Sequence, residues 1–99
     1  MAQRQRLIVG NWKMHKTIPE ARDFVKQLAG LLPKSHPAKV TIVLAPPFTV
    51  LSAVAEAIKS LPVELSGQDA HWENHGAFTG EVSVSMLKDA GCRYVIVGH

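Results

Sequence analysis

Short apolar runs alternate along the chain with segments whose apolar residues recur at helical spacing, and this alternation constrains the fold most. A strand that is apolar at nearly every position is typical of a sheet buried on both faces. The order strand-helix-strand-helix-strand-helix-strand therefore predicts an α/β fold with a parallel sheet. The expected strands cover residues 6–11, 40–45, 63–68 and 94–98, and the expected helices cover residues 18–32, 51–58 and 81–90.

Local signals mark the helix ends. Thr17 and Glu20 form the pattern of a capping box, with Pro19 tolerated in the first helical turn. Pro33 is expected to end this helix, and Gly91 suits the position just past the third one. Right-handed crossovers would bring the carboxyl ends of all four strands to one edge, where α/β folds carry their ligand sites.

Composition narrows the range of partners. The 99 residues carry a net charge of +3, and the basic residues are scattered rather than interleaved with aromatic ones, so we expect no nucleic-acid partner. No apolar stretch approaches the roughly 18 residues of a membrane span, and no signal peptide is recognisable, so we expect a cytoplasmic protein without a membrane partner. Cys92 is the single cysteine, and we interpret it as a small buried thiol.

Polar side chains follow the first and last apolar runs immediately after a glycine. Asn11 and Lys13 come after Gly10, and His99 comes after Gly98. In extended geometry Asn11 and Lys13 point the same way, and a lysine there offers positive charge to a phosphate or a developing oxyanion. His99 could act as a general acid or electrophile, although a histidine at a strand end is more often a hydrogen-bonded structural residue.

The segment from Asp69 to Gly80 is expected to be a long loop that carries the apolar residues Trp72 and Phe78. Such a loop either folds over its own domain or forms an interface. His71 and His75 have a spacing that could bind a metal on a helix, but they fall in this loop without a third ligand nearby, so no metal site is expected. The sequence has no dinucleotide or P-loop fingerprint.

Five motifs, taken together and in order, closely resemble the triosephosphate isomerase family. They are VGNWKM at residues 9–14, APP at 45–47, GQD at 67–69, GAFTGE at 76–81 and VIVGH at 95–99. The resemblance implies a (β/α)8 barrel, of which this chain supplies the first four strands and three helices. Residues 1–99 would then form the N-terminal half of a single barrel domain.

The resemblance also implies roles for individual residues. Lys13 and His99 would be catalytic, with His99 as the neutral electrophile, and Asn11 and Lys13 would bind the substrate. Gly76, Phe78 and Thr79 would lie at the interface of a homodimer, with Thr79 reaching the neighbouring site. The activity would be the interconversion of dihydroxyacetone phosphate and glyceraldehyde 3-phosphate through an enediolate, in glycolysis and gluconeogenesis, without a cofactor or metal. Asp69 stands where many relatives carry asparagine.

The glutamate base of the family lies downstream of the matching motifs, so the 99 residues alone are expected to be inactive. An alternative interpretation is a half-barrel that serves as a folding or assembly module without catalysis.

Overall fold

The computed structural model describes residues 4–32 and 39–99, and it contains a four-stranded parallel sheet. The strand order is β1-β2-β3-β4, so each strand pairs with its neighbour in the sequence. Arg6 lies opposite Val40 at the start of β1, and Asn11 lies opposite Ala45 at its end. The predicted parallel α/β arrangement is therefore confirmed. The strands are β1 (Arg6–Asn11), β2 (Val40–Ala45), β3 (Val63–Gly67) and β4 (Tyr94–Val95).

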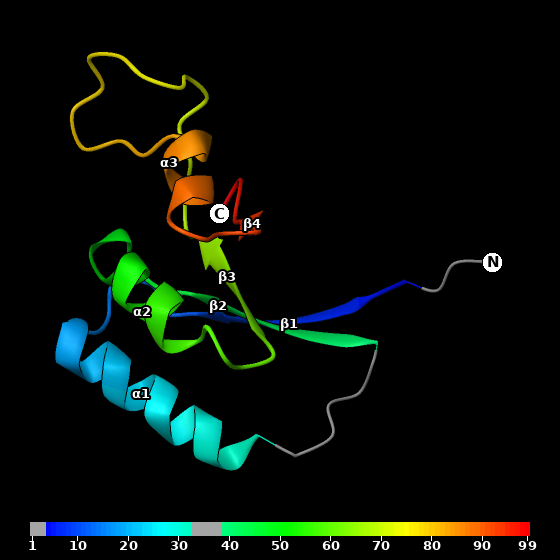
Figure 1. The fold of residues 1–99 in the computed structure, drawn as a ribbon. Helices are drawn as coiled ribbons and strands as arrows, with labels where there is room; N and C mark the ends of the chain where they lie inside the picture. Colours follow the sequence, from blue (N-terminus) through cyan, green and yellow to red (C-terminus); the bar gives the residue numbers. More distant parts are fainter. Residues whose placement is uncertain (1–3, 33–38) are drawn as a thin grey trace.

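Helices connect the strands in the predicted order. They are α1 (Ile18–Leu31), the 3-10 turn η1 (Phe48–Val50), α2 (Leu51–Ala57) and α3 (Val84–Asp89). Figure 1 shows α1 and α2 side by side on the same side of β1 and β2, while α3 lies beside β3 and β4. No helix in the described part of the chain is both long enough and apolar enough to cross a membrane.

The start of α1 follows the sequence prediction. The Glu20 side chain accepts hydrogen bonds from the backbone N–H and the hydroxyl of Thr17, both at 2.9 Å. The pKa of Glu20 lies below its ordinary value, mainly because the backbone N–H of Thr17 donates a hydrogen bond to the carboxylate. Pro33, predicted to end this helix, lies outside the described residues.

Several predicted boundaries were wrong. The first two helices end at Leu31 and Ala57, each one residue early, and the third ends at Asp89. The third helix begins at Val84 rather than at residue 81, because the Ser83 hydroxyl accepts a hydrogen bond from the Met86 N–H and caps the helix there. The fourth strand ends at Val95 rather than at residue 98. Ile96 still donates a hydrogen bond to the Gly67 carbonyl, but Gly98 has a φ of 70° and turns the chain. The third strand ends at Gly67, one residue early.

The core lies between the sheet and its helices. Val25 of α1, Leu51 and Val54 of α2, Leu65 of β3 and Leu87 of α3 are all buried within it. The first strand differs from the prediction of burial on both faces, because it is an edge strand in this part of the chain. Three apolar residues of β1 remain exposed to solvent. The exposed fraction is 46% for Leu7, 61% for Ile8 and 45% for Val9.

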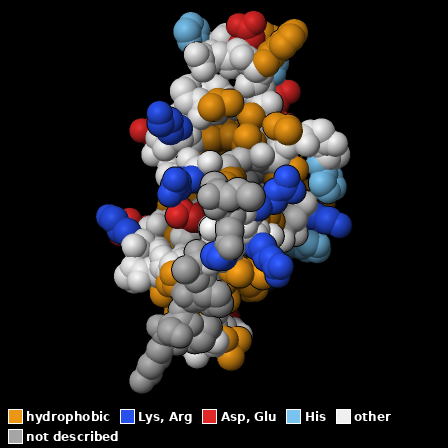
Figure 2. All heavy atoms as spheres, turned by 90° about the vertical axis from the view of Figure 1, so that its right-hand side faces the viewer, with side chains coloured by type: hydrophobic (Ala, Val, Ile, Leu, Met, Phe, Trp, Pro, Cys, Tyr) orange, Lys and Arg blue, Asp and Glu red, His pale blue; other side chains and the backbone are white. Residues whose placement is uncertain are grey.

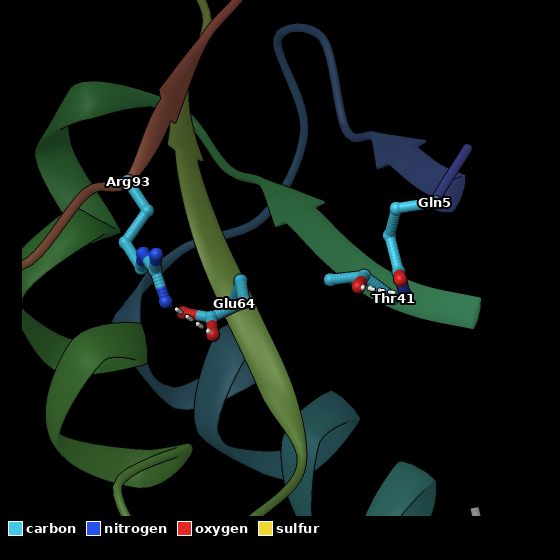
Figure 3. Close-up of polar contacts among 4 residues, drawn as sticks. All are labelled: Gln5, Thr41, Glu64 and Arg93. Carbon is cyan, nitrogen blue, oxygen red and sulfur yellow. Dashed lines mark hydrogen bonds and ion pairs between the residues drawn. The ribbon is translucent and has the colours of Figure 1, made fainter. Parts of the chain in front are cut away.

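Polar contacts join neighbouring strands away from the core. Gln5 donates a hydrogen bond to the Thr41 hydroxyl at 2.8 Å, and Arg93 forms an ion pair with Glu64 at 3.4 Å (Figure 3). Seen from the side on which β1 begins, Lys and Arg side chains gather around the middle of the face, with hydrophobic side chains above them (Figure 2). Because surface ion pairs contribute little, burial against the helices carries most of the stability.

Close packing between β3 and α3 depends on Gly67. A Cβ atom at this buried position would lie 2.7 Å from Leu87 Cδ1 and 3.3 Å from Leu87 Cγ. Leu87 is itself only 4% exposed, so it has little room to move away. The absence of a side chain at Gly67 therefore lets α3 approach the end of the strand.

We expect Gly67→Ala to lower the free energy of unfolding by about 1–3 kcal/mol, the usual cost of overpacking a core. Gly30→Ala is the matched control, because a Cβ at Gly30 in α1 meets none of the described residues within 4 Å. That substitution should raise the free energy of unfolding by up to about 1 kcal/mol, through helix propensity. Urea unfolding measures both, and a Gly67→Ala protein as stable as the Gly30→Ala protein would contradict the packing argument.

Candidate active site

A hollow of about 360 Å³ opens where the carboxyl ends of the strands meet. It brings together Asn11 and Lys13, at and just after the end of β1, and His99 from the chain that follows β4, although His99 lies at least 86 positions beyond the other two in the sequence. Their catalytic and binding roles stay predictions. The lining residues are Asn11, Lys13, Met14, Gln68, Asp69, Ile96, Gly98 and His99.

The backbone turns sharply between Asn11 and Lys13. Lys13 has a φ of 54°, which is in the left-handed region, and its N–H donates a hydrogen bond to Asn11 Oδ1 at 2.9 Å. An asparagine that bonds the backbone two residues ahead starts a turn of this kind. The prediction that the two side chains share a direction through extended geometry was therefore wrong. They line the same hollow because the asparagine bends the chain.

Gln68 holds this turn from the neighbouring part of the sheet. Its Nε2 donates hydrogen bonds to the carbonyl oxygens of Lys13 and Ala45, both at 2.8 Å. One side chain after β3 thus fixes the backbone beyond β1 and the end of β2. Sequence reasoning gave Gln68 no role. Its position as the last residue of the third predicted strand, at the same edge as Asn11, was the signal that could have found it.

Charges of both signs line the hollow. The side chains of Lys13, Asp69 and His99 are all exposed to solvent there. In the described residues, Lys13 and Asp69 do not form an ion pair within 4.0 Å. The ammonium is therefore free to attract an anionic group that enters the hollow.

Gly76, Phe78 and Thr79, the predicted interface residues, lie outside the hollow, on the loop that projects beyond α3 (Figure 1). Gly76 has a φ of 147°, and a Cβ there would lie 2.7 Å from the Phe78 ring. Phe78 in turn packs on His71, with ring centroids 4.1 Å apart. The loop is thus internally packed. Two of its aromatic residues are nevertheless exposed to solvent, with exposed fractions of 90% for Trp72 and 43% for Phe78.

His71 and His75 both line a small cavity of about 140 Å³ between this loop and the start of α3. The Nε2 atom of His71 is buried and has no hydrogen-bond partner among the described residues. Within residues 4–32 and 39–99, His, Cys, Asp and Glu side chains form no group of three that could hold a metal ion. Cys92 is partly buried, and that burial raises its pKa, so the thiolate needed for nucleophilic chemistry is disfavoured.

Comparison with known proteins gives one family. The family model described as triosephosphate isomerase matches residues 6–99. A triosephosphate isomerase of Synechococcus sp. (strain CC9902) is 52% identical over 96 residues, which are 97% of this chain and 39% of the relative. The one from Geobacter metallireducens is 55% identical over 93 residues, covering 94% of this chain and 36% of the relative.

The triosephosphate isomerase of Moorella thermoacetica is 48% identical over 96 residues, covering 97% of this chain and 37% of the relative. The chain thus spans less than two fifths of the length of these three relatives. The match nevertheless includes every described strand and helix. The chain belongs to the triosephosphate isomerase family.

Proposed function

We propose that this chain supplies the Asn11, Lys13 and His99 side of a triosephosphate isomerase active site. The reaction is the interconversion of dihydroxyacetone phosphate and glyceraldehyde 3-phosphate by proton transfer through an enediolate, as part of glycolysis and gluconeogenesis in the cytoplasm. One observation carries the proposal: the three side chains line a single hollow at the carboxyl edge of the sheet. Residues 1–99 would be the N-terminal half of one barrel domain.

Lys13 provides positive charge for the substrate. Its ammonium attracts the phosphate and stabilises the negative charge that develops on the carbonyl oxygen during proton transfer. Asn11 positions it by accepting the hydrogen bond from the Lys13 N–H, and it contacts the substrate from the same hollow. The Gln68 hydrogen bond to the Lys13 carbonyl limits the movement of this turn when an anion binds.

His99 acts on the carbonyl group. As a neutral imidazole it donates a hydrogen bond to the carbonyl oxygen and so makes the adjacent carbon easier to deprotonate. The base that removes this proton is a carboxylate in a part of the protein beyond these residues. The reaction moves protons only, so it requires no redox cofactor.

The projecting loop is the proposed contact with a second copy of the chain. Gly76, Phe78 and Thr79 belong to it, and the high exposure of Trp72 leaves an apolar surface on it. Met14, which borders the hollow, is 93% exposed and offers a second apolar contact. A homodimer would cover these side chains and bring Thr79 close to the partner's hollow.

We expect Lys13→Ala in the complete protein to lower kcat/KM by about 10²–10³-fold, the range for loss of one group that stabilises developing charge. Stability should change little, because the Lys13 side chain is exposed. A coupled assay with dihydroxyacetone phosphate measures the rate. Lys59→Ala is the control, since the Lys59 side chain is 79% exposed and, in the described part of the chain, forms an ion pair with the exposed Glu56 alone. Equal activity in both variants would show that Lys13 is an ordinary surface charge.

We expect His99→Gln to lower kcat by about 10²–10⁴-fold with a much smaller change in KM, because polarisation of the carbonyl is needed mainly in the transition state. Steady-state kinetics over a range of dihydroxyacetone phosphate concentrations separate the two constants. A variant that loses affinity but keeps its turnover would assign His99 to substrate positioning instead.

The alternative function, a half-barrel assembly module, is favoured by the exposed apolar side chains of β1. Leu7, Ile8 and Val9 lie on a strand that has β2 as its one neighbour in the described sheet, and its other edge could pair with another strand. A module without chemistry would show no turnover for either substitution to reduce. The same kinetic assays therefore separate the two functions.

A further inference from the structure

The turn from Trp12 to Thr17 contains two lysines with left-handed backbone conformations. Lys13 has a φ of 54° and Lys16 a φ of 86°. L-residues other than asparagine and aspartate rarely adopt such values, and they do so where surrounding contacts compensate for the strain. The compensation at Lys13 comes from Asn11 and Gln68. Lys16 has contacts of a different kind.

The Lys16 ammonium lies over two aromatic rings. Its Nζ is 5.5 Å from the centroid of the Trp12 ring and 5.0 Å from that of Phe24. These two rings pack edge to face at 5.0 Å, and Trp12 is only 7% exposed. A cation over aromatic faces at this distance is attracted by their quadrupoles. Lys16 therefore ties the far end of the turn both to its buried beginning and to α1.

Lys16 is placed to act on the hollow without contacting a ligand in it. It is not one of the residues that line the hollow, whereas Lys13 and Met14, which precede it in the same turn, both line it. Lys13 and Met14 are exposed, and Lys16 is partly buried. The middle of the turn thus faces solvent and the hollow, while its two ends are held by Trp12 and Lys16.

We propose that Lys16 is a positioning residue, which fixes the turn that presents the Lys13 ammonium through its contacts with Trp12 and Phe24. This inference rests on the proposed function of Lys13. Removal of the Lys16 charge frees one end of the turn, so the Lys13 ammonium samples more positions and stabilises the transition state less well. A cation of similar length at this position preserves the contact, because guanidinium groups also bind aromatic faces.

The test compares Lys16→Met, which keeps most of the stem but removes the charge, with Lys16→Arg in the complete protein. Steady-state kinetics with dihydroxyacetone phosphate should show about a tenfold lower kcat for Lys16→Met, with KM changed less than threefold, and Lys16→Arg should restore kcat to within about twofold. Lys59→Met is the matched control and should match the unsubstituted protein. A Lys16→Met enzyme with kcat within twofold of the unsubstituted protein overturns the proposal.

A second pair of variants separates positioning from simple stabilisation. Lys16→Gly removes the ammonium but also removes the left-handed strain, so it should lose activity like Lys16→Met without a lower melting temperature than that variant. In a Lys13→Ala background, Lys16→Met should change the remaining rate less than twofold, because there is no ammonium left to position. A further tenfold loss in that background overturns the proposal.

The outcomes for Lys13 and Lys16 are distinguishable. If Lys13→Ala leaves the rate unchanged, the proposed function of Lys13 fails and this inference fails with it. If Lys13→Ala abolishes most activity while Lys16→Met does not alter it, only the role of Lys16 is wrong.

Discussion

Parallel pairing between neighbouring strands is the constraint on which the rest of the structure depends. The continuous register between β1 and β2 and the pairing of β3 with both neighbours place four strand ends at one edge. Asn11 ends β1, Gln68 directly follows β3, and the chain leading to His99 follows β4. Parallel strands require crossovers, and α1, α2 and α3 provide both these crossovers and the apolar surface that covers one face. The sheet is part of the (β/α)8 barrel of the triosephosphate isomerase family.

The elements could be predicted from apolar periodicity because each type of element leaves its own spacing in the sequence. The capping box was also readable, since Thr17 and Glu20 contact each other within one helical turn. The boundaries at Val84 and Val95 were not readable in this way. They depend on which hydroxyl reaches an N–H and on where a glycine turns the chain, so apolarity alone extended both elements too far.

The site was partly predictable for a similar reason. A polar residue at the end of an apolar run points to the carboxyl edge of the sheet, and this placed Asn11 and His99. The hydrogen bonds of Gln68 could not be predicted, because Gln68 and Lys13 meet only after β1 and β3 have taken their places in the same sheet. Contacts between residues 55 positions apart leave no local pattern.

The central claim is that Lys13 and His99 act on one ligand. The most direct measurement is an NMR titration of the complete protein, with ¹⁵N in its lysine and histidine side chains, using dihydroxyacetone phosphate. The account predicts that the Lys13 and His99 signals shift with the same midpoint, and that Lys13→Ala abolishes the His99 shift over the same concentration range. If only one of the two signals shifts, or if the His99 shift survives without Lys13, the two residues do not share a ligand and the account is contradicted.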